Sequence, residues 1–194
     1  MNQEDFETER RRRIEIVQGC GGVLPHCEAF YIHSVQYAAS RSYEAFLRYD
    51  GYLASSADAS TIVSTVHGAL SHAAALSRFF WPSRSKGLAS SRGETLRNRF
   101  DVTDQSPLHE HEMRNALEHL DARLDEYLLW NDAGYFFPGA MVDNHELADD
   151  PVGRIFKLVD PKHQVFVVLG QKFDFRPVRA EVKRILERTE AEGA

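Results

Sequence analysis

Apolar residues at helical spacing fill the first two thirds of the chain. They recur every three or four positions from about 26 to 49 and again from about 58 to 81, which is typical of amphipathic helices. Asp58 is a good N-cap for the second helix, and Pro82 follows its end. The predicted core-facing residues are Ile32, Val35, Ala38, Ala39, Ser42, Ala45, Phe46 and Tyr49 in the first helix and Ile62, Val66, Ala69, Leu70, Ala73 and Phe80 in the second. The pattern predicts two long helices that each bury one face.

A third long helix has the clearest start in the chain. Ser106 is a good N-cap and Pro107 suits the first helical position, so a helix is expected from there to about Trp130. Its apolar stripe comprises Met113, Ala116, Leu117, Leu120, Leu124, Tyr127 and Leu128. Shorter helices are predicted at about 4–18, 93–100 and 177–191, and a Ser- and Gly-rich linker at 83–91.

The period changes after Pro138. Residues 154–159 and 164–169 are rich in Ile, Val and Phe, which predicts two strands. The intervening Asp160-Pro161-Lys162-His163 is suited to a four-residue hairpin loop. Tyr135-Phe136-Phe137 is compatible with a further strand.

These elements predict a mainly α fold. We expect one domain over residues 1–194, made of an antiparallel helical bundle at about 26–132, a β-hairpin at about 153–170 and a final helix at about 177–191.

The composition is that of a globular protein, with 43% hydrophobic and 27% charged residues. No apolar run is long enough to span a bilayer, and the acidic N-terminus, Met1 to Asp5, lacks the apolar region of a signal peptide. A cytoplasmic protein without a membrane partner is therefore expected. Cys20 and Cys27 are predicted to be free thiols, because they form neither a CxxC motif nor part of a disulfide framework. The net charge of −6 argues against general nucleic-acid binding, so any such contact has to be local.

The third long helix carries candidate chemistry away from its apolar stripe. Helical spacing directs Arg114 and His119 to its flanks and Asn115 almost opposite the stripe. A histidine can move the proton of a ribose 2′-hydroxyl, and an arginine can hold a phosphate and stabilise its developing charge. The alternative is that Arg114 forms an ordinary surface ion pair with Glu118, four residues later, and that His119 is solvated.

Arg114, Asn115 and His119 resemble the Arg-x4-His motif of the HEPN superfamily, in which a polar residue often follows the arginine. The stretch from Ser106 to Asp125 also resembles a group of uncharacterised bacterial HEPN-like proteins. The resemblance implies a metal-independent endoribonuclease without a cofactor, in which Arg114, Asn115 and His119 are catalytic. It further implies a homodimer through the helix that carries Arg114 and His119, an RNA substrate, and a toxin–antitoxin or defence role with a cognate antitoxin. The alternative within the superfamily is a non-catalytic binding or interaction module.

Two other groups of residues are candidates for RNA binding. Arg92, Arg97 and Arg99 are in the most basic part of the chain and can line an RNA path, or else belong to a solvated loop and short helix. Phe79-Phe80-Trp81 can stack bases, although an aromatic helix end that closes the bundle is the more ordinary interpretation.

No metal site is expected from the sequence. His109 and His111 point about 200° apart if they belong to one helix, and so do not share an ion.

Overall fold

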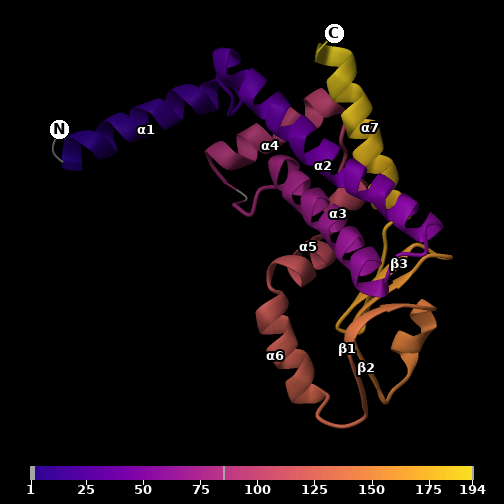
Figure 1. Ribbon diagram of the computed structural model, residues 1–194. Helices are drawn as coiled ribbons and strands as arrows, with labels where there is room; N and C mark the ends of the chain where they lie inside the picture. The colour runs from indigo at the N-terminus through magenta and orange to yellow at the C-terminus, as the bar shows by residue number, and fades with distance from the viewer. Residues whose placement is uncertain (1–2, 85, 194) are drawn as a thin grey trace.

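The computed structural model describes residues 3–84 and 86–193 (Figure 1). Met1, Asn2, Ser85 and Ala194 lie outside the described residues. The predictions for the acidic N-terminus, the 83–91 linker and the limits of the single domain are therefore considered only for the remainder.

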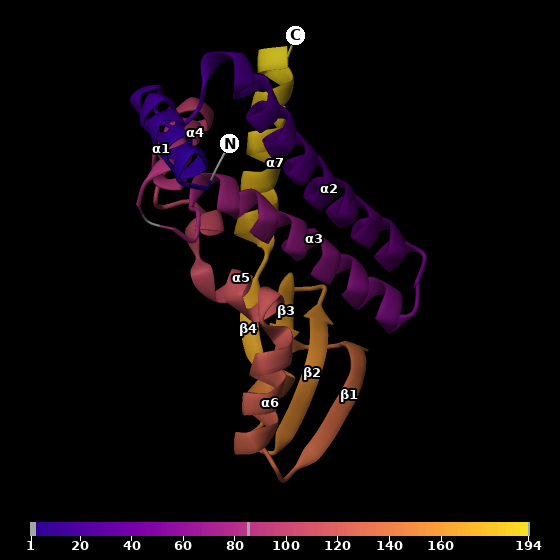
Figure 2. The ribbon, with the colours of Figure 1, turned by 90° about the vertical axis from the view of Figure 1, so that its left-hand side faces the viewer.

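The predicted mainly helical architecture with a C-terminal helix is confirmed, and the predicted β-hairpin is part of a small four-stranded sheet. The long helices α2 (Glu28–Ala54) and α3 (Ala59–Phe80) run antiparallel, and α7 (Arg176–Gly193) packs against α2 (Figures 1 and 2). As predicted, Asp58 caps α3, because its carboxylate accepts a hydrogen bond from the Thr61 amide at 3.0 Å. The helix α2 continues past the predicted end at Asp50-Gly51, and its interface with α7 contains the stacked rings of Phe46 and Phe175, 5.7 Å apart.

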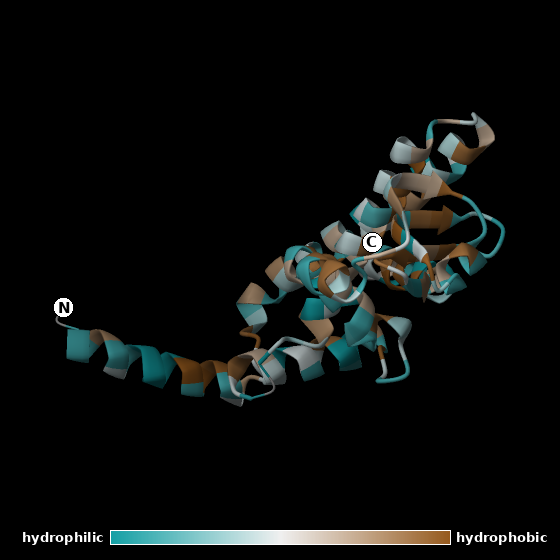
Figure 3. Ribbon diagram, turned by 90° about the horizontal axis from the view of Figure 1, so that it is seen from below, coloured by the Kyte–Doolittle hydropathy of each residue, from teal (hydrophilic) through white to brown (hydrophobic). Residues whose placement is uncertain are grey.

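The N-terminal helix α1 (Gln3–Gly19) projects from the rest of the molecule, and none of its described residues is buried (Figures 1 and 3). The 3₁₀ turn η1 (Pro25–Cys27) connects it to α2. The helix α4 (Leu88–Phe100) starts earlier than predicted, within the expected linker.

The predicted third helix is divided into three pieces. Ser106 caps only the 3₁₀ turn η2 (Pro107–His109), and the helices α5 (His111–Glu118) and α6 (Leu120–Trp130) are separated at His119. The helix α5 packs on α3, whereas α6 turns away and runs alongside the sheet (Figures 1 and 2). The sequence around His119 contains neither Pro nor Gly, so the break results from these two different packing environments and not from a local signal.

The sheet contains four strands in the order β1 (Tyr135–Val142), β2 (Gly153–Asp160), β3 (Val165–Val168) and β4 (Gln171–Asp174). The predicted hairpin is the antiparallel pair β2–β3, and β4 extends it. The edge strand β1 pairs with β2 in parallel, and the 3₁₀ turn η3 (His145–Asp149) lies in the connection between them. The sequence prediction contained neither this parallel pairing nor β4.

The two faces of the sheet have different partners. Alternate residues of β3 point to opposite faces of the sheet. Phe166 and Val168 belong to the main core with the helices. Val165 and Val167 belong to a smaller cluster with Ala148 of η3. The sheet thereby links the helical core to η3. In the described ranges, no helix has the combination of length and apolar character needed to cross a membrane.

Candidate functional site

The structure buries Arg114. Its side chain extends from α5 toward the end of α3, where Nη1 donates a hydrogen bond to the carbonyl oxygen of Trp81 at 3.2 Å. The residue is only 8% exposed, so the sequence-based placement of Arg114 on the flank of a solvated face is wrong. The helical wheel misplaced it because α3 packs on this side of α5 as well as on the apolar stripe.

The alternative ion pair between Arg114 and Glu118 does not form. Glu118 pairs with Arg78 of α3 instead. Within residues 3–84 and 86–193, Arg114 makes no ion pair with a carboxylate. It is a buried cation whose hydrogen-bonding partner is a neutral carbonyl.

His119 and Asn115 lie at the break between α5 and α6. The backbone of His119 leaves the helical conformation (φ −118°, ψ 38°), although its amide still donates to the carbonyl of Asn115 at 3.1 Å. The His119 side chain is exposed, and Asn115 is half-buried. The motif residues therefore differ in environment: Arg114 faces the interior, whereas His119 faces solvent.

Three arginines satisfy backbone carbonyls at the end of α3. The last carbonyl groups of a helix lack partners within it, and cationic side chains are favourable there. The bonds run from Arg92 to the carbonyl of Arg78 at 3.3 Å, from Arg97 to that of Phe80 at 2.6 Å, and from Arg114 to that of Trp81 at 3.2 Å. The arginines of this region therefore have a structural role, which is to bond the carbonyl groups at the end of α3.

Contacts within the protein also account for Arg92, Arg97 and Arg99, the three arginines of the expected RNA path. Arg99 also has a partner within the protein, because its Nη1 donates to Glu28 at 2.7 Å. Each of the three side chains therefore makes a hydrogen bond within the protein. Phe80 and Trp81 are buried at the end of α3. This agrees with the interpretation of Phe79-Phe80-Trp81 as an aromatic helix end that closes the bundle.

Two histidines, His109 and His111, lie close to Trp81 and Arg114. The ring of His109 stacks on Trp81 with centroids 4.7 Å apart, and the ring of His111 lies 5.3 Å from that of His109. Because His109 belongs to η2 and not to a continuous helix, the helical argument that separated the two imidazoles does not hold. Burial lowers the pKa of His111, and the positive charge of Arg114 lowers it further.

A cleft of about 420 Å³ with a mixed polar and apolar lining lies between the helices and the sheet. It borders Ala116 on α5, and Arg123 crosses it to bond Gln171 of β4 at 2.7 Å. Neither Arg114 nor His119 lines this cleft. The predicted catalytic residues are therefore not gathered in it within a single chain.

Sequence reasoning missed a second cluster, formed by His145, Asp160 and His163. The residues are separated along the chain, so no motif spacing reveals them; the only local signal is the Asp-Pro-Lys-His hairpin loop. No family model, curated protein or solved structure matches the chain.

Proposed function

We propose that the chain is a HEPN-type, metal-independent endoribonuclease that acts as a homodimer in a toxin–antitoxin or defence system. In this proposal Arg114 stabilises the scissile phosphate, His119 exchanges protons with the ribose or the leaving oxygen, and Asn115 orients one of these groups. An RNA and a cognate antitoxin are its partners.

The observation that carries the proposal is the burial of Arg114 without an anionic partner. Removing a guanidinium from water is costly unless an opposite charge compensates, and one carbonyl oxygen supplies only part of that compensation. The nearest expected carboxylate, that of Glu118, is engaged by Arg78. A phosphate group that reaches the edge of Arg114 would provide the missing negative charge bidentately.

His119 is suited to proton transfer. Its side chain is exposed at the break between α5 and α6, where substrate can reach it. An imidazole can act as either acid or base in proton transfer. The helix break frees this imidazole from a continuous helical surface.

Exposed apolar residues support the dimer. Leu128, Leu129 and Trp130 at the end of α6, and Tyr135, Phe136 and Phe137 at the start of β1, form what we call the apolar end. Between the two elements is a mainly apolar groove of about 320 Å³. A second copy that covers the apolar end would bring a second α5–α6 segment to the same region.

The hydrogen bond from Arg114 to Trp81 favours a second candidate, the non-catalytic HEPN-like binding module. In that case Arg114 is retained to complete the end of α3 and not to contact phosphate. The two candidates differ in whether the purified protein cleaves RNA.

The test is cleavage of RNA by the purified protein in the presence and absence of a chelator. We expect cleavage in both conditions and a loss of about 10²- to 10⁴-fold in His119→Ala, because a positioned acid or base typically contributes that much. Arg114→Lys retains the charge but not the bidentate geometry, and is expected to reduce cleavage while remaining folded. His33→Ala, at an exposed histidine of α2, is the matched control.

Circular dichroism and thermal unfolding of each variant separate loss of activity from loss of fold. Cleavage that is undiminished in folded His119→Ala and Arg114→Lys would eliminate the proposed catalytic roles. A wild-type protein that binds RNA or a protein partner without cleaving RNA would establish the second candidate instead.

A further inference from the structure

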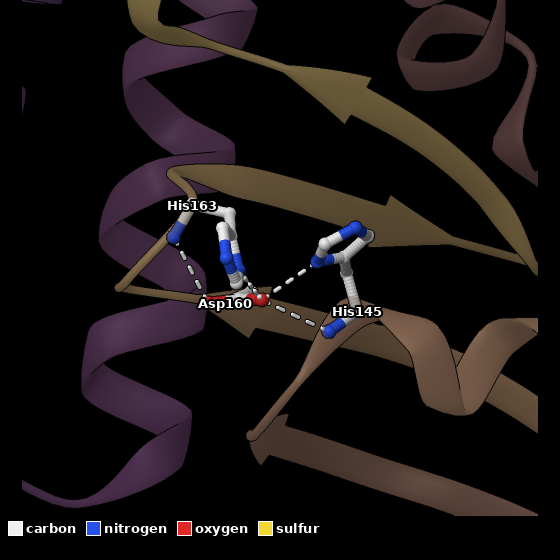
Figure 4. Close-up of side chains that lie close together, drawn as sticks. All are labelled: His145, Asp160 and His163. Atoms are coloured by element: carbon white, nitrogen blue, oxygen red, sulfur yellow. Dashed lines mark hydrogen bonds and ion pairs between the residues drawn. The ribbon is translucent and has the colours of Figure 1, made fainter.

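Three side chains converge between η3 and the β2–β3 hairpin (Figure 4). His145 is the first residue of η3, Asp160 ends β2, and His163 lies in the loop that leads to β3. Both imidazoles direct Nδ1 at the same carboxylate oxygen, Oδ2 of Asp160, at 2.7 Å from His145 and 2.8 Å from His163. Their possible ligand atoms all lie within 4.8 Å of one another.

The backbone holds this geometry in place. The amides of His145 and His163 each donate to the Asp160 carboxylate at 3.1 Å, one to Oδ2 and the other to Oδ1. The side chain of Asn144 caps η3 by accepting a hydrogen bond from the Glu146 amide at 3.0 Å. The three candidate ligands are thus attached to ordered backbone, as a metal site requires.

Asp160 is only 2% exposed but is held in the charged form. Burial on its own would raise the pKa of this carboxyl. The hydrogen bonds from the His145 and His163 side chains, together with those from their backbone amides, outweigh burial and keep the pKa far below its usual value. The buried carboxylate thus lies where both imidazoles reach it.

One oxygen of Asp160, Oδ2, has more hydrogen-bond contacts than it has lone pairs. The His145 amide, the His145 ring and the His163 ring all reach Oδ2, whereas each carboxylate oxygen offers about two lone pairs. A cation between the rings and the carboxylate resolves this conflict, because it accepts the Nδ1 lone pairs and an oxygen lone pair together. The backbone amides would then remain as supporting hydrogen bonds to the carboxylate.

The donor set selects the class of metal. Two imidazoles and one carboxylate suit Zn²⁺, whereas Ca²⁺ and Mg²⁺ prefer oxygen ligands and Cu⁺ prefers sulfur. Tetrahedral Zn²⁺ separates its ligand atoms by about 3.3 Å, so each ring has to withdraw from Asp160 Oδ2 by about 0.5 Å, and the two imidazoles, whose ligand atoms lie within 4.8 Å of each other, have to turn toward one ion. Partial exposure of both histidine side chains leaves a path for the ion to enter.

We propose that His145, Asp160 and His163 form a Zn²⁺ site with a fourth position open to water. The ion ties η3 to the β2–β3 hairpin. This site goes beyond the proposed ribonuclease, contributes none of its catalytic residues, and is tested without RNA. It also differs from the expectation from sequence that the chain has no metal site, which did not consider His145 and His163.

The experiment uses the full-length protein without a histidine tag, stripped with a chelator and dialysed. Calorimetric titration with Zn²⁺ and visible absorption with Co²⁺ should each show one equivalent bound, the Co²⁺ spectrum having the intense bands of a tetrahedral site. Zn²⁺ should also raise the melting temperature of the stripped protein, because a ligand that binds the folded state stabilises it.

His163→Gln is the primary variant, because the His163 side chain is partly exposed and the change keeps the loop soluble. His145→Gln is the second, and His26→Gln, at an exposed position in η1, is the matched control. Both site variants should lose the equivalent of metal and the rise in melting temperature, and the control should keep them. Absence of stoichiometric binding in the wild type, or undiminished binding in either folded site variant, overturns the proposal and leaves a metal-free hydrogen-bond cluster.

Discussion

The side chains of His67 and Lys157 meet where α3 packs on the sheet. Lys157 Nζ lies 3.4 Å from His67 Nδ1, and because an ammonium can only donate, Nδ1 has to be the acceptor. The His67 ring also stacks on Phe166 with centroids 6.0 Å apart. Burial lowers the pKa of His67, and the nearby charge of Lys157 lowers it further. The fold therefore favours the neutral imidazole.

This preference predicts a pH dependence of stability. The unfolded state binds the proton more readily, so stability conferred by neutral His67 is fully present above the unfolded pKa of 6.5 and is lost as the pH falls from there through the lower folded pKa. His67→Gln should reduce the slope of unfolding free energy against pH in this window. Urea unfolding from about pH 5 to 8 measures it. An equal slope in the wild type and His67→Gln would contradict the assignment, and His26→Gln is the control.

At the level of elements, the close crossing of α4 over the end of α3 depends on Gly93. A Cβ at this position would lie 2.6 Å from the carbonyl oxygen of Phe80 and 3.0 Å from Pro82. The same carbonyl accepts the hydrogen bond from Arg97, so the approach of the two helices and the arginine contacts belong to one arrangement.

Gly93→Ala is therefore expected to destabilise the protein by about 1–3 kcal/mol, as overpacking does. Gly51→Ala in α2 is the matched control, since nothing lies within 4 Å of its added Cβ, and it should stabilise the protein by about 0.5–1 kcal/mol through helix propensity. Chemical unfolding of the three proteins gives both values. A neutral or stabilising Gly93→Ala would show that the crossing is loosely packed.

Sequence reasoning succeeded where the signals are local. The cap at Asp58, the apolar stripes of α2 and α3, and the strand pattern of the hairpin all act within a few residues, and the structure confirms them. It failed where distant segments decide the outcome. The break at His119 and the burial of Arg114 follow from packing against α3 and the sheet, which helical periodicity does not contain.

The cluster of His145, Asp160 and His163 could not be predicted either, because distant segments of the chain bring its residues together. His145 and Asp160 are fifteen positions apart and meet because β1 pairs with β2 in parallel and η3 folds back between them. Only the contact between Asp160 and His163, three positions apart in a hairpin loop, has a sequence signal. Hydrogen bonding in that loop is its ordinary interpretation.

On the scale of the whole molecule, α6 is a largely exposed helix beside the sheet (Figures 1 and 2). None of its described residues is buried, and clefts lie between it and the sheet. Leu129, Trp130 and Tyr135 of the apolar end are 72%, 77% and 70% exposed. Large aromatic side chains contribute about 150–250 Å² each when buried, and tryptophan is prominent among residues that dominate interfaces. The apolar end is therefore the surface on which a homodimer is expected to form.

Trp130→Glu is predicted to convert the proposed homodimer to a folded monomer, because it places a charge within the apolar end. Sedimentation equilibrium of the wild type should give twice the chain mass and that of Trp130→Glu the chain mass. Leu47→Glu, at an exposed leucine on α2 outside the apolar end, should remain dimeric. A wild-type protein that stays monomeric up to about 100 μM would remove the dimer from the proposal.

If the two half-sites work together, the monomer should also lose RNA cleavage although Arg114, Asn115 and His119 are intact. The reason is geometric, because one chain separates a buried Arg114 from an exposed His119 and leaves the first without an anion. The decisive measurement is cleavage by Trp130→Glu at concentrations where the wild type is dimeric. A monomeric variant with full activity would place the whole reaction within one chain, whereas an inactive monomer alongside an active Leu47→Glu dimer would show that a partner copy completes the site.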